Sequence, residues 1–324
     1  MKNPSLDSIV PPGPYAAHDI VCTGLRFPEG PVALPDGSVL VVEIERGCLT
    51  RIQPDGAASV AAQTGGGPNG AAVGPDGAIY VCNNGGFEWA RGDGLLRPAG
   101  QPADYRGGSI QRVDLRTGQV DTLYDACDGH VLAGPNDLVF DHHGGFYFTC
   151  NGKRRPREAD RGGVYYALPD GSSIREVIFP IFFPNGVGLS PAEDLLYVAE
   201  TETGRLWAFD IVAPGQLRLL PYPSPNGGRY AFGSSHYQRF DSLKVEQDGR
   251  VCVATLSRGG ITTVDPDGGN ETFDALDDRM VTNLCFGGDD MRTAWITLSS
   301  TGRLARMRWP RPGLKLNFQD LARC

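Results

Sequence analysis

The chain has 324 residues, of which 40% are hydrophobic, and its formal net charge is −8 at pH 7. This acidic balance argues against a nucleic acid or an anionic membrane as a partner, and no apolar run is long enough to span a bilayer. The first 15 residues contain one Lys and no apolar run of signal-peptide length, so we expect a cytoplasmic protein without a targeting segment.

One phrase recurs along the chain, and each copy predicts a unit of short β-strands. In the first copy we expect strands over residues 31–34, 38–43 and 48–53, with a Pro-Asp-Gly turn at 35–37. Runs such as VLVV, IYVC and FYFTC are rich in β-formers and too brief for buried helices. The six copies are FPEGPVALPDGSVLVVE (27–43), GPNGAAVGPDGAIYVCN (67–83), GPNDLVFDHHGGFYFTCN (134–151), FPNGVGLSPAEDLLYVAE (183–200), RFDSLKVEQDGRVCVAT (239–255) and VTNLCFGGDDMRTAWIT (281–297).

The spacing of the copies predicts the fold class. Strand units that recur about every 40–50 residues, with few helices, are typical of β-propellers. The copies extend from near residue 27 to past residue 300, which leaves no room for a second domain. We therefore predict an all-β, six-bladed β-propeller that forms a single domain over residues 1–324.

Two further features concern closure of the ring and its loops. We expect residues 18–25 to add the outer strand of the last blade, with the segment 314–318 as the alternative. Insertions at 87–108, 153–163 and 226–240 should lie on the loop faces, where they could roof a site or remain solvated loops without a function. Of the 8 Cys, those in strand patterns are expected to be reduced and buried, namely Cys82, Cys150, Cys252 and Cys285.

The third residue of every copy carries a side-chain oxygen. Innermost propeller strands begin at the central channel, so these residues should converge there as an oxygen cage for one divalent ion. Turn formation by Asn or Asp before Gly is the alternative, but Glu is a poor turn former and unpaired buried carboxylates are costly. No marked residue is His or Cys, which favours Ca²⁺, although Zn²⁺, Mn²⁺ or Mg²⁺ could replace it. The marked residues are Glu29, Asn69, Asn136, Asn185, Asp241 and Asn283.

Several of these motifs together give the chain a resemblance to a known family. FPEGP, GPND, FPNG, the segment 240–243 and TNLCFGGDD resemble the senescence-marker-protein/gluconolactonase family, which includes regucalcin. The resemblance implies a six-bladed propeller with one divalent ion in its channel, acting mostly on lactones. It implies metal ligation by Glu29, Asn185 and Asp241, and a metal or substrate contact by Asn136. Diisopropyl fluorophosphatase, a related propeller, is similar in using one Glu, two Asn and one Asp on its calcium.

Two departures from the family pattern concern residues beside the expected ligands. Ser242 follows Asp241 where many relatives have Gly, and the third copy reads FYFTC, with Cys150, where many relatives read FYFTD. Neither changes an expected ligand, but both bear on the choice of substrate.

Together, the motifs and the resemblance predict a metal-dependent lactonase that binds a small-molecule lactone and forms a monomer or small homo-oligomer. Asp241 is expected to be both a ligand and the general base or nucleophile, and Asn136 to orient the substrate. Further substrate contacts are expected from Asn69, Trp89 and His236. The alternatives are a phosphotriesterase, a non-catalytic calcium-binding propeller, and a carbohydrate- or protein-binding propeller that needs no ion.

Overall fold

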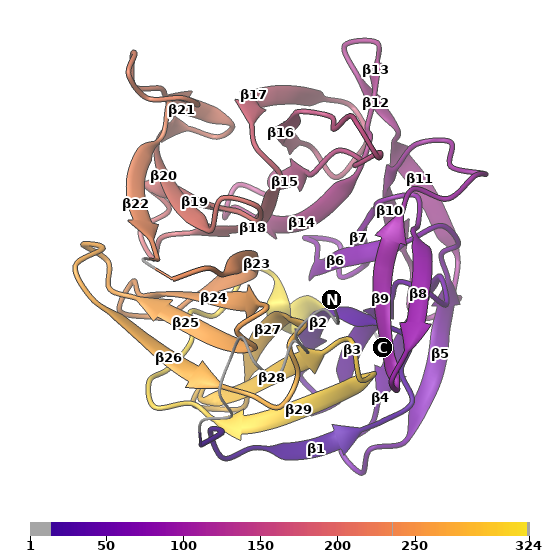
Figure 1. The fold of residues 1–324 in the computed structure, drawn as a ribbon. Coiled ribbons are helices and arrows are strands. Elements are labelled where there is room, and N and C mark those ends of the chain that lie inside the picture. The colour runs from indigo at the N-terminus through magenta and orange to yellow at the C-terminus, as the bar shows by residue number, and fades with distance from the viewer. Residues whose placement is uncertain (1–13, 235, 323–324) are drawn as a thin grey trace, which may run out of the picture.

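The computed structural model describes residues 14–234 and 236–322. Six large sheets surround a central axis and form a six-bladed β-propeller (Figure 1), which confirms the predicted fold class. Within this described range the one helix is the short 3-10 helix η2 (Gln319–Leu321), and none is long and apolar enough to cross a membrane. The sequence that we interpreted as lacking a targeting segment lies mostly outside this range, as do the last two residues of the predicted domain.

The first three blades follow one another along the chain. Blade 1 consists of β2 (Pro28–Ala33), β3 (Val39–Glu43), β4 (Cys48–Ile52) and β5 (Ala58–Gln63). Blade 2 consists of β6 (Pro68–Val73), β7 (Ile79–Asn83), β10 (Ser109–Val113) and β11 (Val120–Tyr124). Blade 3 consists of β14 (Pro135–Phe140), β15 (Phe146–Cys150), β16 (Gly162–Ala167) and β17 (Ile174–Ile181).

The next three blades complete the ring. Blade 4 consists of β18 (Pro184–Leu189), β19 (Leu195–Glu200), β20 (Arg205–Ala213), β21 (Gln216–Arg218) and β22 (Arg229–Gly233), which also pairs with β20. Blade 5 consists of β23 (Arg239–Val245), β24 (Val251–Leu256), β25 (Gly260–Val264) and β26 (Glu271–Ala275). Blade 6 consists of β27 (Val281–Gly287), β28 (Thr293–Leu298), β29 (Arg303–Arg308) and β1 (Asp19–Cys22).

The N-terminal strand closes the ring, as predicted. β1 pairs antiparallel with β29, and Asp19 lies opposite Arg306. The alternative segment, 314–318, crosses one end of the channel instead. There Leu314 N donates to Val245 O of blade 5 at 2.9 Å, and the Asn317 side chain donates to Phe140 O of blade 3 at 3.1 Å.

The recurring phrase places a β-bulge beside its marked residue in every innermost strand. The pairing register of β2 with β3 shifts between Glu29 and Val32, and the other five blades show the same irregularity. A bulge turns a side chain out of the strand's alternation. Close packing between blades explains why Gly follows Glu29. A Cβ on Gly30 would lie 2.4 Å from the backbone oxygen of Asn69 in the next blade.

The repeat unit differs from its prediction in two ways. β2 begins at Pro28 rather than at residue 31, because the bulge keeps Glu29 within the strand. Blades 1 to 5 also have outer strands that the sequence analysis missed, whereas the outer strand of blade 6 was predicted. In β5 most side chains are exposed, so the hydrophobic alternation that marks a half-buried strand is absent.

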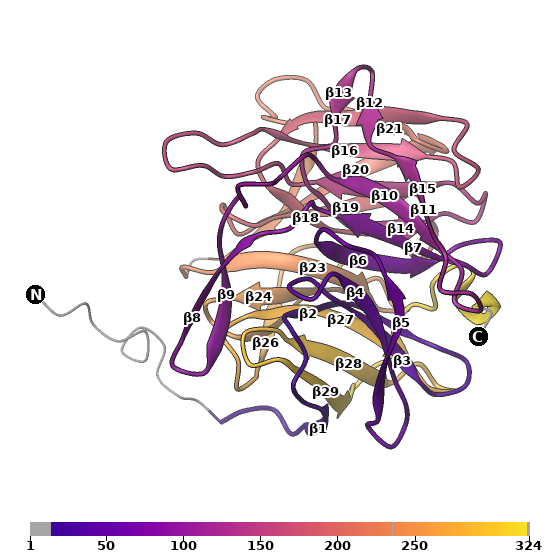
Figure 2. The ribbon, with the colours of Figure 1, turned by 90° about the vertical axis from the view of Figure 1, so that its right-hand side faces the viewer.

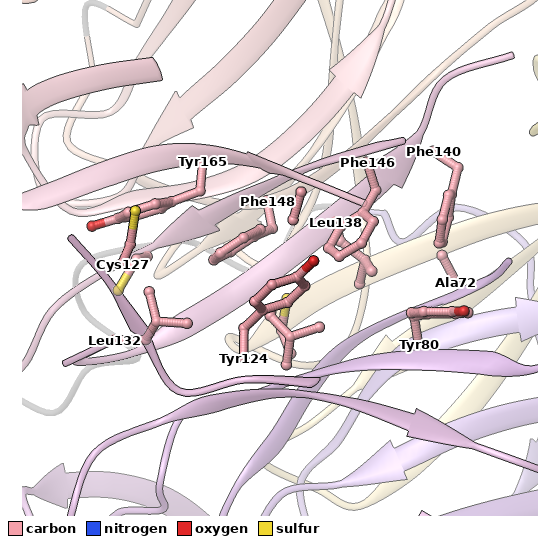
Figure 3. Packing of buried hydrophobic residues seen from close by; sticks show 14 of the residues in the cluster. Ala72, Tyr80, Tyr124, Cys127, Leu132, Leu138, Phe140, Phe146, Phe148 and Tyr165 are labelled. Carbon is pink, nitrogen blue, oxygen red and sulfur yellow. The ribbon is translucent and has the colours of Figure 1, made fainter. Parts of the chain in front are cut away.

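Apolar side chains fill the spaces between neighbouring blades. Figure 3 shows the cluster between blades 2 and 3, in which the Tyr80 and Phe140 rings meet edge to face at 5.1 Å between centroids. The thiols of Cys82 and Cys150 belong to this cluster, and the seven cysteines in the described part of the chain are free and buried. These wedges fix the angle between blades and so the positions of the innermost strands.

The first and second insertions line the cavity at one end of the channel, whereas the third differs from its prediction in part, because its β22 pairs with β20 in the sheet of blade 4. Residues of the first insertion form a hairpin of β8 (Glu88–Gly92) and β9 (Leu95–Gly100), between β7 and β10. Figure 2 shows this hairpin on one face of the ring and the C-terminal end on the opposite face. The second insertion connects β15 to β16, and the third contains β22. A small hairpin of β12 (Ala126–Cys127) and β13 (His130–Val131) leads into blade 3.

Candidate metal centre

The six marked residues are all buried, and five of them line one cavity. Its volume is about 870 Å³, and residues of the β8–β9 hairpin form part of its lining. The marked residues in its wall are Glu29, Asn69, Asn136, Asn185 and Asp241. The sequence-based expectation that these side chains converge is therefore met for five blades.

The sixth marked residue, Asn283, does not line the cavity but holds Glu29 in place. Its side-chain nitrogen donates to Glu29 Oε2 at 2.7 Å, and the Gly30 N–H donates to the same oxygen at 2.6 Å. Burial raises the pKa of Glu29 to about 7, although these two hydrogen bonds favour its charged form. Glu29 Oε1 is left for a ligand, because both donors use the other oxygen.

Asp241 shares the low-dielectric environment of Glu29. Burial is the main cause that raises the pKa of Asp241, and the charge of Glu29 raises it further. Arg239 and a hydrogen bond from Asn185 oppose these effects only in part. Two buried carboxylates that repel each other are costly unless a cation neutralises them. The pair therefore has the electrostatics of a cation site.

The amide oxygens of Asn136 and Asn185 provide the second sign of a ligand. Both atoms are buried without a hydrogen-bond partner, while the Asn185 nitrogen is committed to Thr201 Oγ1 at 3.1 Å. Buried polar atoms in native proteins are nearly always paired. Two unpaired oxygens beside two carboxylates fit a hard cation, because Ca²⁺ binds amide and carboxylate oxygens alike.

This arrangement differs from an ordinary cluster of charged ligands. Over residues 14–234 and 236–322, no group of three or more His, Cys, Asp or Glu side chains could hold a metal ion. A metal ion in the channel would therefore need the amide oxygens of Asn136 and Asn185 in addition to Glu29 and Asp241. This composition fits a hard oxygen-binding ion better than a thiolate- or imidazole-binding one.

Two further residues, which the sequence analysis missed, lie beneath the centre. Lys244 Nζ is 3.5 Å from Asp137 Oδ2, and Asp137 is buried. Burial raises the pKa of Asp137, and the Lys244 charge opposes this. The charge of Asp137 also raises the pKa of Glu29, and the charge of Lys244 lowers it. The signal was present in the phrase, because the third copy has Asp137 at the position that Gly occupies in the first, second and fourth copies.

The remaining predicted substrate contacts lie in different places. Asn69 lines the cavity, and its backbone oxygen packs on Gly30. Trp89 is not among the described residues that line the cavity; its ring packs on Phe27, with centroids 5.2 Å apart, behind the wall. His236 is exposed and is likewise outside the described lining. A substrate contact by either residue stays a prediction, and neither is supported by this geometry.

The outer wall of the cavity is rich in basic side chains. Several of them come from the insertion at 153–163, and the sequence analysis left open whether this insertion has a function. Arg154 and Arg239 both pair with Glu202, at 2.5 Å and 3.5 Å. The sequence could not show which basic residues of KRRPREADRGG turn inward. The basic residues in the cavity wall are Arg97, Lys153, Arg154, Arg155 and Arg239.

Residues 27–300 match the sequence model of the SMP-30/Gluconolactonase/LRE-like region. The chain belongs to this family. It is 30% identical to lactonase drp35 of Staphylococcus saprophyticus over 186 residues, which are 57% of this chain and 49% of that protein. The chain thus spans about half the length of that relative.

For two other similar proteins, the match extends over a larger share of their length. Diisopropyl-fluorophosphatase of Loligo vulgaris is 26% identical over 245 residues, 69% of this chain and 76% of that protein. The crystal structure of regucalcin from Agrobacterium tumefaciens, described as a calcium-binding protein, superposes with a TM-score of 0.71. The two are 16% identical over 96% of this chain and 98% of that one, so this likeness bears on the fold alone.

Proposed function

We propose that this family member is a metal-dependent lactonase whose single divalent ion is held by Glu29, Asn136, Asn185 and Asp241. The pair of unpaired buried amide oxygens beside two buried carboxylates is the observation that carries the proposal. Ca²⁺ is the favoured ion, and the calcium-binding description of the regucalcin structure supports that choice. Zn²⁺, Mn²⁺ or Mg²⁺ remain alternatives, because four oxygen ligands select weakly among hard cations.

The ion, when bound, would polarise the lactone carbonyl and stabilise the oxyanion that forms on attack. Asp241 would serve as general base or nucleophile, because a carboxylate that ligates through one oxygen keeps the other free. Asn136, which lies in the same cavity wall, would orient the substrate from the opposite side, together with Asn69. Asn283 and Gly30 would fix the Glu29 carboxylate through their hydrogen bonds to Oε2.

A small-molecule lactone is the substrate class that we propose, and the name of the Staphylococcus relative supports it. The cavity is large enough for a substituted lactone, since sites for small molecules usually measure about 300–1,000 Å³. The cytoplasmic location and the oligomeric state, a monomer or small homo-oligomer, stay predictions.

A phosphotriesterase is the second candidate. The similarity to the Loligo enzyme extends over 76% of that protein, and the same carboxylate and amide oxygens would suit a phosphoryl oxygen. The two functions differ in the reacting centre, which is a planar carbonyl carbon in one case and a tetrahedral phosphorus in the other.

A substrate panel separates these candidates. Sugar, aliphatic and aromatic lactones and diisopropyl fluorophosphate are assayed by proton release, with metal-saturated and chelator-treated protein. We expect hydrolysis of at least one lactone class, loss of that activity on chelation, and recovery with Ca²⁺. Hydrolysis of the fluorophosphate alone would favour the phosphotriesterase, and equal rates with and without chelator would reject metal dependence.

A further inference from the structure

The cavity wall has a positive charge balance, whereas the whole chain carries −8. Five cationic and four carboxylate side chains line it. Glu29 and Asp241 belong to the proposed metal centre, where the ion would neutralise them. Only Glu88 and Glu202 then remain to oppose five cations. A cleft with an excess of one sign attracts ligands of the opposite charge.

The arginines on one side of this wall already have carboxylate partners. Glu202 pairs with Arg154 and Arg239, and Arg155 pairs with Asp160. The charges of these three guanidinium groups are therefore paired within the protein, although Arg239 Nε is buried without a hydrogen-bond partner. They give shape and field to the wall but need no anionic ligand.

Lys153 is different, because no carboxylate of the described residues lies within ion-pair distance of its ammonium. The side chain is 3% exposed, and Nζ donates to the backbone oxygen of Gly86 at 2.9 Å. Nζ also lies over two rings, 4.6 Å from the centroid of Phe87 and 4.9 Å from that of Tyr105. A buried ammonium without a counter-ion is costly. The rings of Phe87 and Tyr105 and the carbonyl of Gly86 hold the Lys153 ammonium in one place in the wall of the cavity.

Arg97, on β9, is the second cation of the wall without a carboxylate partner in the described part of the chain. Its Nε atom is buried and has no hydrogen-bond partner. Lys153 and Arg97 come from different insertions, one between β15 and β16 and one between β7 and β10, yet both line the same cavity.

We propose that the substrate is a lactone that bears a carboxylate, and that Lys153 binds this carboxylate while the ring carbonyl lies at the metal centre. The inference rests on the proposed lactonase function. An ammonium has three N–H donors, and Gly86 uses one, so two remain for the two oxygens of a carboxylate. A monoanionic group balances the single charge of Lys153. Arg97 adds to the attractive field.

A purely structural role for Lys153 is the competing explanation. The same contacts with Gly86, Phe87 and Tyr105 would fasten the first insertion to blade 3 without any ligand. In that case, loss of the charge would affect every substrate equally. A binding role predicts an effect that depends on the charge of the substrate.

The test uses two lactones with one ring, 5-oxotetrahydrofuran-3-carboxylate and its neutral carboxamide. Wild-type protein saturated with Ca²⁺ is compared with Lys153→Met, which keeps the apolar stem, with Lys153→Arg, which keeps the charge, and with Arg116→Met. Arg116 is an exposed cation outside the cavity and is the matched control for a change of net charge. Thermal unfolding is recorded for each variant.

We expect the wild type to prefer the carboxylate in kcat/KM. Lys153→Met should reduce kcat/KM for the carboxylate by about 10–100-fold, the usual effect of one charged hydrogen bond, and change the carboxamide by less than about threefold. Lys153→Arg should retain part of the preference, and Arg116→Met should retain all of it. Equal losses for both lactones in Lys153→Met, or a wild type that prefers the carboxamide, would overturn the proposal.

A binding experiment separates this inference from the lactonase proposal. The ketone 3-oxocyclopentane-1-carboxylate and its carboxamide have no ester bond to hydrolyse, and their affinities are measured by calorimetry. If no lactone is hydrolysed but the ketone carboxylate binds tightly to the wild type and weakly to Lys153→Met, the lactonase proposal fails and the carboxylate site stands. If the two ketones bind the wild type equally, the carboxylate site is wrong whatever the activity.

Discussion

The side-chain nitrogen of Asn283 donates to Glu29 Oε2 at 2.7 Å, and this bond joins the last blade to the first at the channel. Asn283 Oδ1 in turn accepts the Leu284 N–H at 2.8 Å, so both ends of the amide are committed. The bond fixes the orientation of a proposed metal ligand without itself reaching the cavity. It connects the last blade to the first at their innermost strands, whereas β1 closes the ring at the outer edge of blade 6.

Asn283→Ala should therefore weaken the metal site without removing a ligand. Loss of a hydrogen bond that orients a ligand typically costs about 10–100-fold in metal affinity. We expect a decrease of that size in Ca²⁺ affinity by calorimetry, with a secondary decrease in activity that saturating Ca²⁺ restores. Unchanged affinity in a folded variant would show that Glu29 needs no such support.

Asn69→Ala is the matched comparison, because Asn69 holds the same position of the phrase but lies in the cavity wall. We expect Ca²⁺ affinity to stay within about threefold of the wild type and KM to rise by about tenfold, the effect of one lost neutral hydrogen bond to the substrate. Kinetics at saturating metal measure KM. A Ca²⁺ affinity lowered as much as in Asn283→Ala would instead place Asn69 among the ligands.

Asp241→Asn tests the role of this residue as a base. The amide keeps a ligating oxygen but cannot accept a proton, and a positioned general base contributes about 10²–10⁴-fold. We expect kcat to fall within that range while residual activity still depends on the metal. Metal occupancy must be measured in the same samples, because the variant also removes one negative charge from the metal site. A fully occupied variant with the wild-type rate would make Asp241 a ligand only.

The charge of Lys153 should set an upper pH limit for a carboxylate-bearing substrate. Burial lowers the pKa of Lys153 to about 8, while the charges of Cys150 and Asp160 oppose this effect. Besides these groups, Nζ faces the Gly86 carbonyl and the rings of Phe87 and Tyr105. The ammonium is positive below about pH 8 and loses its proton above it, so KM for the carboxylate lactone should rise there.

The pH profile has two internal controls. KM for the carboxamide should stay flat over the same range, and Lys153→Arg should remove the rise, because a guanidinium keeps its proton. Rates are corrected for spontaneous hydrolysis. A rise of equal size in the arginine variant, or for both lactones, would assign the pH dependence to another group.

The architecture could be predicted because one phrase encodes both the innermost strand and its bulge. The residues around Glu29 and Asn185 show this, since the same Pro and Gly flank each and lead to the same register shift. The outer strands could not be predicted as well. They are largely solvated, so β5 lacks the continuous apolar run that identifies β3.

The candidate site was predictable where it depends on the repeat and not where it depends on the loops. Asn136 and Asp241 are placed by strands whose position follows from the ring. The direction of Lys153 depends on its contacts with Phe87 and Tyr105 in another insertion, and no local pattern records that pairing. The direction of Trp89, which lies on β8 and packs on Phe27, was equally beyond a local pattern, and its contact with a substrate stays a prediction.

The most direct test of the account is a Ca²⁺ titration of metal-stripped protein, followed in parallel by calorimetry and by the rate of lactone hydrolysis. We expect one site per chain, a rate that rises in proportion to its occupancy, and a shift of both curves by at least about tenfold in Glu29→Gln, because a charged ligand is lost. A full rate before any Ca²⁺ has bound, or an unchanged binding curve in folded Glu29→Gln, would contradict the account.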